Sequence, residues 1–391
     1  MELDIIQIFS LLVVFVSLLL AAFLLTMRSE NYLSNLFLAG FLIVRAIDSD
    51  GIFLGGYIYP NYPAMGIFLS SLVFFEMPLL YLYLISVIFS GFKLKWKHLW
   101  HALPFLINFI VFIPRFYAVG TEEQLEYLLS QTISDREIEV QFSYILVHAQ
   151  IFVYLIACFL LVNKYRRLLL ENYSNASLFN FNWLFQFLII FSIDMIMASL
   201  KNLFMFFGSE DAYFYSMVIT SLMALTYIIW MVMKTLRHPE LFRGIDSKLQ
   251  LVKKLVKEEA GFEHGSPDKP EPQIQFNKKI EILSNYMVDK EPFLDPSLTI
   301  YELSKQIGFP AKELSLLINH DLNQHFFDFV NGFRIRKAME ILADPDKKEL
   351  TVLEILYEVG FNSKSSFNTA FKKYTQLTPT EYRKKHLQSA A

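Results

Sequence analysis

The first part of the chain alternates between long apolar runs and short polar connections. About 20 consecutive apolar residues are enough to cross the hydrocarbon core of a bilayer as one helix. Seven runs reach that length, at about 5–26, 33–57, 65–89, 97–117, 141–163, 182–207 and 213–234. Soluble helices of this length normally keep a polar face, and these runs do not. The pattern predicts an all-α fold that opens with a sensor domain of seven transmembrane helices over residues 1–235.

A different pattern begins near residue 276, where short amphipathic segments replace the apolar runs. An eleven-residue pattern occurs twice, 52 positions apart, from Thr299 to Phe309 and from Thr351 to Phe361. Each copy opens with Thr-x-x-Glu, a capping box that pairs the free N–H groups at a helix start. Each then reaches a glycine, which ends a helix by adopting a left-handed conformation. Because a second short helix follows each copy, we expect two helix-turn-helix units, whose second helices enter the DNA major groove.

The second copy and the residues after it resemble the AraC family of bacterial transcriptional regulators. The resemblance is carried by Gly360-Phe361-Asn-Ser363, by Phe367 and Phe371, and by the closing Leu-Thr378-Pro379-Thr-Glu-Tyr382-Arg383. Residues 329–338 resemble the family's linker helix. The resemblance covers roughly residues 277–386. It implies a DNA-binding domain over 276–391, with units at about 298–320 and 351–374 and a linker helix at about 326–342.

Three positions depart from the family pattern. Leu356 stands where the family usually has alanine at the helix crossing, and Ser304 occupies the same place in the first unit. Gln376 stands in place of a glycine after the second recognition helix.

The second recognition helix has an apolar side and a polar side. Phe367 and Phe371 are four residues apart, so both are expected to face the core, and Ser363 is the expected N-cap. The opposite side carries the candidate base contacts, which the family resemblance also implies: Lys364, Ser365, Asn368 and Thr369. Asparagine pairs with adenine, lysine with guanine, and a threonine methyl contacts thymine. The alternative is an ordinary solvated face.

The first helix-turn-helix unit offers fewer candidate base contacts, namely Lys312 and Ser315. We therefore expect the second helix-turn-helix unit to discriminate more between DNA sequences. Phosphate contacts are expected from the basic residues Lys372, Lys373, Arg383, Lys384 and Lys385. Residues 364–386 contain six basic residues against Glu381, whereas 276–391 as a whole carries a net charge of only +1. Phosphate neutralisation supplies most non-specific affinity. We therefore expect one domain to bind weakly and a homodimer to bind better.

Charged residues in the connections predict the orientation. Arg28, Lys93, Lys95, Lys97, Lys164, Arg166 and Arg167 lie in alternate connections, and the remaining connections are acidic. Positively charged loops stay in the cytoplasm. This places the chain in a bacterial inner membrane, with the N-terminus outside the cytoplasm and the C-terminal domain inside.

Residues 236–275 connect the two parts. Ile245, Leu249, Val252 and Val256 follow a helical spacing, with lysines on the other faces. This fits an amphipathic helix on the inner leaflet or a short coiled coil between two protomers. Residues 261–272 are expected to form a flexible tether.

Ionisable residues inside the predicted spans are costly in a bilayer and are candidates for function. They are Arg45, Asp48, Asp50, Glu76, Asp194 and Lys201. Two interpretations stay open: a ligand pocket that opens outward, or buried ion pairs that fix helix register. Arg45 and Asp48 are three residues apart and are expected to be able to pair.

No sequence pattern supports an enzyme, a metal site or a cofactor. The only cysteine, Cys158, excludes an intrachain disulfide, and no P-loop, HExxH or nucleophile elbow occurs. His98 and His101 lie near two tryptophans, which is typical of a membrane interface. The favoured hypothesis is a membrane-embedded one-component transcription factor that binds double-stranded DNA and responds to a small-molecule or membrane signal. An activator would also contact RNA polymerase. The alternative is a seven-span transporter or receptor whose C-terminal domain only tethers it to DNA or protein.

Overall fold

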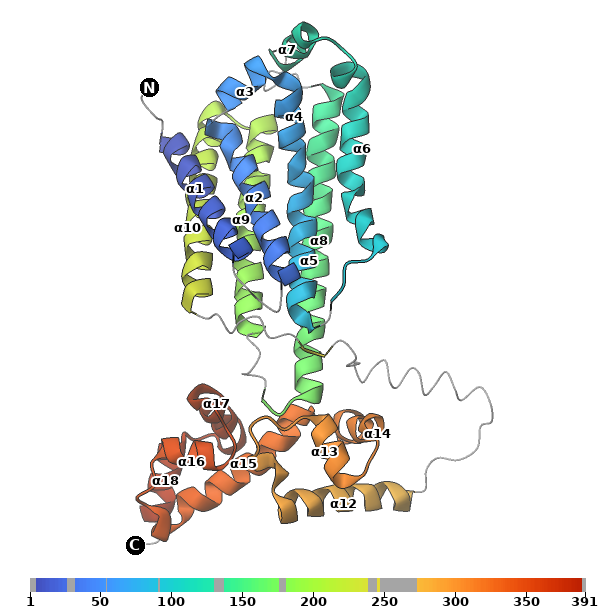
Figure 1. Cartoon of the computed structure of the whole chain (residues 1–391). Helices are drawn as coiled ribbons and strands as arrows, with labels where there is room; N and C mark the ends of the chain where they lie inside the picture. The colour runs from blue at the N-terminus through green and yellow to red at the C-terminus, as the bar shows by residue number, and fades with distance from the viewer. Residues whose placement is uncertain are drawn as a thin grey trace, which may run out of the picture. The chain divides into compact units, whose positions relative to one another are not determined.

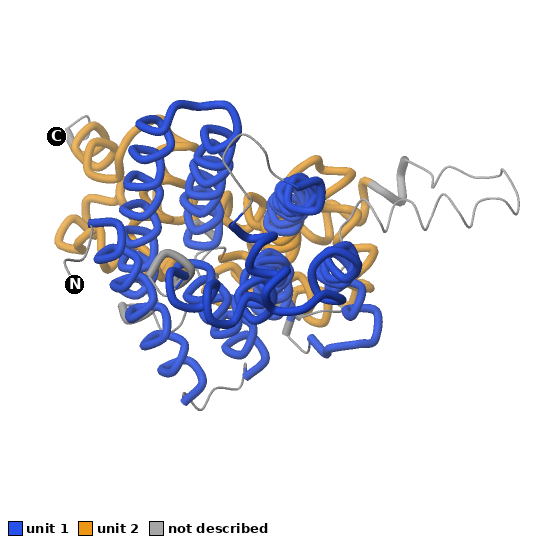
Figure 2. Tube along the Cα trace, turned by 90° about the horizontal axis from the view of Figure 1, so that it is seen from above, with its two compact units in different colours: residues 1–163, 182–247 blue, residues 164–181, 248–391 orange. Residues whose placement is uncertain are grey.

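The structure is a computed structural model that describes residues 5–26, 32–53, 55–90, 92–129, 137–175, 181–237, 245–246 and 273–388. The chain divides into two compact units (Figure 2). Unit 1 comprises residues 1–163 and 182–247, and unit 2 comprises residues 164–181 and 248–391. The predicted amphipathic helix and tether fall almost entirely outside the described residues.

Unit 1 is a helical bundle (Figure 1). Its helices are α1 (Ile5–Thr26), α2 (Tyr32–Phe53), α3 (Gly55–Asn61), α4 (Pro63–Ser71), α5 (Glu76–Ile88), α6 (Leu103–Phe112), α7 (Thr121–Leu129), α8 (Ile138–Asn172), α9 (Phe181–Phe207) and α10 (Glu210–Arg237). Three tighter or wider turns join them: η1 (Leu72–Phe75), η2 (Trp96–Ala102) and η3 (Ile113–Tyr117). The strands of the described residues are β1 (Phe89–Ser90) and β2 (Ile245–Asp246), which pair in parallel. Ile245 therefore lies in a strand and not in the predicted helix.

Seven helical segments in the described residues are long and apolar enough to cross a membrane, judged by length and composition. They overlap the seven predicted runs, although the second is shorter, at Tyr32–Ser49 against 33–57. The fifth differs in length, since α8 runs for 35 residues to Asn172 and not to residue 163.

The third segment is interrupted at η1, between α4 and α5. Proline has no N–H, so Pro78 cannot bond to the carbonyl of Phe74 four residues earlier. The side-chain amide of Gln150 in α8 donates to that carbonyl at 2.9 Å. A donor from another helix thus satisfies the backbone group that the proline leaves unpaired.

Unit 2 contains two helix-turn-helix units on a shared helix. Its helices are α12 (Gln273–Lys290), α13 (Ile300–Ile307), α14 (Ala311–Leu316), α15 (Phe326–Ala343), α16 (Val352–Glu358), α17 (Lys364–Thr375) and α18 (Pro379–Gln388), with short turns η6 (Pro292–Leu294), η7 (Leu317–Asp321) and η8 (Pro345–Lys347). The last turns of α8 also belong to unit 2.

The linker helix α15 contributes to both hydrophobic cores of unit 2. Phe326 and Val330, near its start, are buried with Leu303 and Leu314 of the first helix-turn-helix. Ile335, Ala338 and Leu342, near its end, are buried with Leu356, Phe367 and Phe371 of the second. One stiff helix therefore holds both helix-turn-helix units, as the resemblance implied. Leu356 is accommodated in the core of the second.

Candidate nucleic-acid interface

Both predicted capping boxes are present with the same geometry. The Thr299 amide donates to Glu302 Oε2 at 2.7 Å, and the Glu302 amide donates to Thr299 Oγ1 at 3.2 Å. The second copy, Thr351 and Glu354, repeats these contacts at 2.7 and 3.2 Å. Hydrogen bonds from Thr351 hold the pKa of the Glu354 carboxyl below its ordinary value.

A third capping box starts α18 and was missed by the sequence analysis. The Thr378 amide donates to Glu381 Oε2 at 2.8 Å, and the Glu381 amide donates to Thr378 Oγ1 at 3.3 Å. The same Thr-x-x-Glu pattern was there to be found. As at Glu354, hydrogen bonds from the threonine lower the pKa of Glu381.

Left-handed residues stand at the ends of α13, α16 and α17, among other places. Gly308 has φ 79° and Gly360 has φ 88°, as predicted for the two turns. A Cβ on Gly360 would lie 2.6 Å from the carbonyl oxygen of Phe293 and 2.7 Å from that of Leu294. Gln376, which replaces the family's glycine, also adopts a left-handed conformation, with φ 61°.

The second recognition helix, α17, presents its two sides as predicted. Phe367, Ala370 and Phe371 are buried, and Ser363 caps the helix by accepting from the Ser366 amide. The candidate base contacts lie on the opposite side: Lys364, Ser365 and Thr369 are exposed and Asn368 is half-buried. Four side chains able to hydrogen-bond or touch base edges therefore share one accessible face.

The first recognition helix differs from the prediction. It is α-helical only to Leu316 and continues as the wide turn η7. Lys312 is exposed, but Ser315 is only 5% exposed and its hydroxyl accepts from the Asn319 amide at 3.2 Å. Ser315 cannot contact a base in this conformation, because its side chain is covered.

The candidate phosphate contacts are not equally available. Lys372, Lys384 and Lys385 are exposed. Lys373 is also exposed, and it pairs with Asp328 Oδ1 of α15 at 2.6 Å. Arg383 is half-buried, and its Nε and Nη2 atoms are inaccessible and have no hydrogen-bond partner among the described residues. Some of the candidate phosphate contacts therefore already interact with other residues of the same domain.

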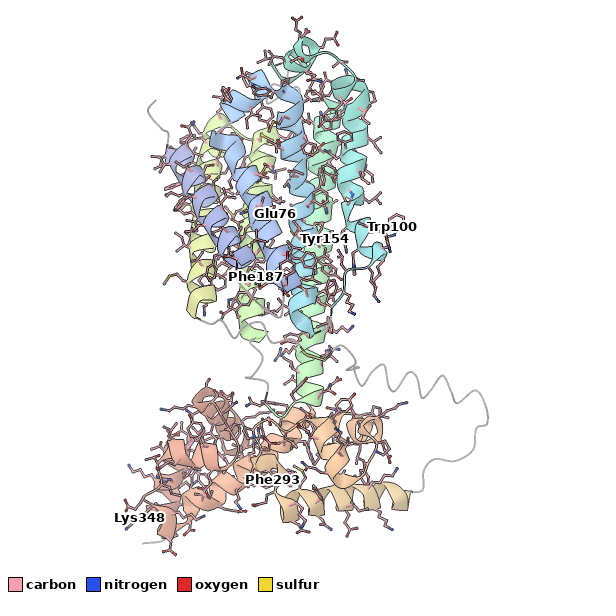
Figure 3. The ribbon with its side chains drawn as sticks, viewed as in Figure 1. Glu76, Trp100, Tyr154, Phe187, Phe293 and Lys348 are labelled. Carbon is pink, nitrogen blue, oxygen red and sulfur yellow. The ribbon has the colours of Figure 1, made fainter. Side chains whose placement is uncertain are left out.

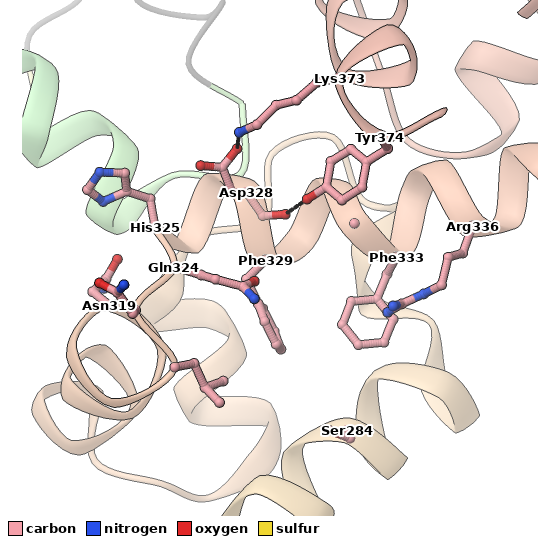
Figure 4. A pocket seen from close by; sticks show the side chains of 13 residues that line it. Ser284, Asn319, Gln324, His325, Asp328, Phe329, Phe333, Arg336, Lys373 and Tyr374 are labelled. Atoms are coloured by element: carbon pink, nitrogen blue, oxygen red, sulfur yellow. Dashed lines mark hydrogen bonds and ion pairs between the residues drawn. The ribbon is translucent and has the colours of Figure 1, made fainter. Parts of the chain in front are cut away.

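A pocket of about 620 Å³ lies between α12, η7, α15 and α17 (Figure 4). Tyr374 closes one side by donating to the Asp328 carbonyl at 2.7 Å, beside the Lys373–Asp328 ion pair. Beside Tyr374, the Arg336 guanidinium lies 4.2 Å from the centre of the Phe333 ring. The pocket separates the two helix-turn-helix units on this side of the linker helix.

Arg334, in the middle of α15, links the two helix-turn-helix units. It is fully buried, and it donates to the carbonyls of Phe293 at 2.7 Å and Asp295 at 2.8 Å. Burial lowers the pKa of Arg334 to about 10, and the charge of Asp295 partly opposes that effect. The same turn, residues 293–295, also contacts Gly360 of the second unit. We call it the 293–295 turn.

The ionisable residues of unit 1 form a smaller cluster than predicted. Arg45 Nη1 lies 2.9 Å from Glu76 Oε1, and Arg45 Nη2 also pairs with Asp194. All three are buried, and Glu76 lies inside the bundle (Figure 3). Among the described residues, Arg45 forms its ion pairs with Glu76 and Asp194 and not with Asp48, which is exposed.

Lys201 and Asp50 complete the predicted set. Lys201 is half-buried, and no ion pair joins it to Arg45, Glu76 or Asp194 among the described residues. The side chain of Asp50 lies outside the described residues. His101 contacts Tyr154 Oη at 2.5 Å, and within the described residues no group of three potential ligands could hold a metal ion.

Comparison with known proteins identifies the C-terminal region. Residues 303–385 match the family model described as a helix-turn-helix domain. This part of the chain is an AraC-type helix-turn-helix domain. The matched residues begin in α13 and end in α18, so they include both units.

The relatives are regulators that share this domain. An uncharacterized HTH-type transcriptional regulator of Staphylococcus aureus (strain COL) is 35% identical over 86 residues, 22% of this chain. The Melibiose operon regulatory protein of Escherichia coli (strain K12) is 28% identical over 90 residues, 23% of this chain and 29% of its own length. The chain spans only 11% of the length of the staphylococcal protein. These relatives support DNA-binding transcription regulation, a function that is generally not enzymatic.

Among solved structures, the C-terminal domain of the response regulator yesN from Fusobacterium nucleatum is similar, with 31% identity and a TM-score of 0.24. The match covers 27% of this chain and 98% of that domain.

Proposed function

We propose that this chain is a membrane-embedded one-component transcription factor, in which unit 1 senses a signal and unit 2 reads DNA as a homodimer. One observation carries the proposal. A single chain combines seven helices of membrane-spanning length with an AraC-type domain whose second recognition helix exposes its candidate base contacts.

The surface of unit 1 supports its placement in a bilayer. Ile145, Phe152, Val153, Ile156 and Leu160 of α8 are each at least 60% exposed. Exposed apolar surface of this extent is unfavourable in water and favourable in lipid. Meanwhile Arg45, Glu76 and Asp194 are buried inside the bundle, where membrane proteins keep their ion pairs.

The proposed location is a bacterial inner membrane, with the N-terminus outside the cytoplasm. The basic residues of the connection at Lys93–Lys97 and of the last turns of α8, at Lys164–Arg167, support this orientation. Reporter domains fused after Ala391 test it. A cytoplasm-active fluorescent reporter should be bright and a periplasm-active phosphatase inactive; the opposite result would rule out access to DNA.

The proposed signal acts at the Arg45–Glu76–Asp194 cluster. Asp194 Oδ1 is buried without a hydrogen-bond partner among the described residues, as is the hydroxyl of Tyr227. Unpaired buried polar atoms are costly, so a bound small molecule or a rearrangement of the ion pairs could satisfy them. Glu76→Gln and Asp194→Asn should alter the output of a promoter reporter. Asp211→Asn, at an exposed position of α10, is the control.

Selection from a pool of random-sequence duplexes, with the full chain in detergent, tests the DNA-reading part. Recovery of a defined sequence that spans two helical turns per protomer supports the proposal. Binding without sequence preference that disappears at moderate salt would instead favour a transporter or receptor with a DNA tether.

A further inference from the structure

Unit 2 contains a segment from the middle of the chain. We call residues 164–175, the last turns of α8 and the three residues after it, the docking segment; they group with residues 248–391 in one compact unit. Tyr165, Leu168 and Leu169 repeat at helical spacing and are each at most 3% exposed. The docking segment therefore has a buried face although it contains Lys164, Arg166 and Arg167, the charged residues that follow the fifth apolar run.

Polar contacts fix the end of the docking segment to three parts of the DNA-binding domain. The Ser174 amide donates to the Leu298 carbonyl at 3.1 Å, and Tyr173 pairs with Thr299 as an isolated antiparallel bridge. Arg334 donates to the carbonyl and to the hydroxyl of Ser174, both at 3.1 Å. Ser174 is 1% exposed. Buried polar groups with complete pairing are typical of a specific interface.

Two more contacts reach the recognition elements themselves. The side chain of Asn319, in the turn that continues the first recognition helix, donates to the Glu171 carbonyl at 3.1 Å. The side chain of Asn175 donates to Asn362 at 2.5 Å, one residue before the N-cap of α17. The docking segment thus reaches from the first recognition element to the second, across the middle of α15 (Figure 1).

This position conflicts with bound DNA. Tandem recognition helices enter successive major-groove turns on one face of the duplex, so DNA must pass over the surface between them. The docking segment covers that surface through Thr299, Asn319, Arg334 and Asn362. Asn319 bonds both to the docking segment and to Ser315, whose hydroxyl is covered. Ser315, a base-contact candidate of the first helix-turn-helix unit, is buried in the docked arrangement.

We propose that the docking segment and DNA compete for one surface of the AraC-type domain, so that the docked form is autoinhibited. The inference rests on the proposed function. Because the segment is covalently continuous with α8, a signal that displaces this helix would release the recognition surface without any other partner.

A reversible crosslink tests the competition. Residues that face each other in an antiparallel bridge have Cα atoms about 4.5–5.5 Å apart, which suits a disulfide. Tyr173→Cys and Thr299→Cys are introduced together in the full chain, with Cys158→Ala. Duplexes recovered with the unmodified chain are the probe. The oxidised protein should bind at least about tenfold more weakly than the same sample after reduction.

Because both states share one sequence, any loss of the Thr299 cap cancels in the comparison. Failure of the pair to crosslink, or equal binding before and after reduction, would overturn the inference. Absence of binding in both states, and in the unmodified chain, would overturn the proposed function and the inference with it.

Ser174→Arg is the complementary variant, since a second guanidinium beside Arg334 should expel the segment. It should raise DNA affinity and promoter output. Asn163→Arg, an equal change at an exposed position of α8, should leave both unchanged. Equal behaviour of the two variants would contradict competition.

Discussion

At the scale of single residues, two glycines that look equivalent in the sequence differ in their surroundings. Gly308 and Gly360 occupy matched positions in the repeated pattern, and both are left-handed. Only Gly360 lies against backbone atoms, the carbonyl oxygens of Phe293 and Leu294. The sequence predicted the conformation of both because it depends on local geometry. It could not predict the close approach, which joins residues far apart in the chain.

Gly360→Ala should therefore destabilise unit 2 far more than Gly308→Ala. A left-handed alanine costs roughly 1–2 kcal/mol, which applies to both variants. At position 360 the clash with backbone adds to that cost, whereas nothing lies within 4 Å of a Cβ at position 308. Hydrogen exchange of α15 and α16 in the full chain measures the difference. Equal protection in the two variants would contradict the close approach.

The capping glutamates predict a pH dependence at the same scale. The pKa of Glu354 is lower in the folded state, so its stabilisation is present above the ordinary value of 4.5 and is lost as pH falls through the folded pKa. Protection of the α16 amides, corrected for intrinsic exchange, should fall over that range. Glu354→Gln keeps the capping contact without titrating. Its protection should change less, and an identical pH profile would count against the assignment.

At the scale of elements, the sequence predicted all seven apolar helices and both helix-turn-helix units. Periodicity and capping are local signals, so they survive without tertiary information. The extension of α8 was missed because Lys164, Arg166 and Arg167 were interpreted as a loop. Yet Leu161, Val162, Tyr165, Leu168 and Leu169 continue a helical spacing. The burial of Ser315 was also missed, since it depends on Asn319 and not on the residue's own position.

The interruption at η1 gives a prediction about the bundle. Gln150→Leu removes the donor that bonds to the Phe74 carbonyl and leaves a buried backbone oxygen unpaired. This should cost about 1–3 kcal/mol. Denaturation of the full chain in mixed detergent measures the loss. Gln141→Leu, at an exposed position of the same helix, is the matched control. A similar cost for both would show that the contact with Phe74 is unimportant.

At the scale of the whole molecule, we expect the second helix-turn-helix unit to contribute more to sequence recognition than the first. Asn368→Ala should relax the preference for one base pair by about 1–3 kcal/mol, while Lys312→Ala should have a smaller effect on preference. Competition between single-base variants of the recovered duplex measures both. Lys384→Ala is expected to weaken binding to all variants alike, because phosphates carry no sequence information. If Lys312→Ala lost the base preference and Asn368→Ala kept it, the first helix-turn-helix unit would be the more selective one.

The 293–295 turn has a consequence for the operator itself. Arg334 bonds to its carbonyls and Gly360 rests against them, so the separation of the two recognition helices is fixed within the fold. The protein then requires one fixed spacing between the two half-sites. One extra base pair between the half-sites shifts the second by about 3.4 Å and rotates it by about 35°. Substitutions in that spacer should be tolerated, whereas a single insertion should abolish recognition by one of the two units.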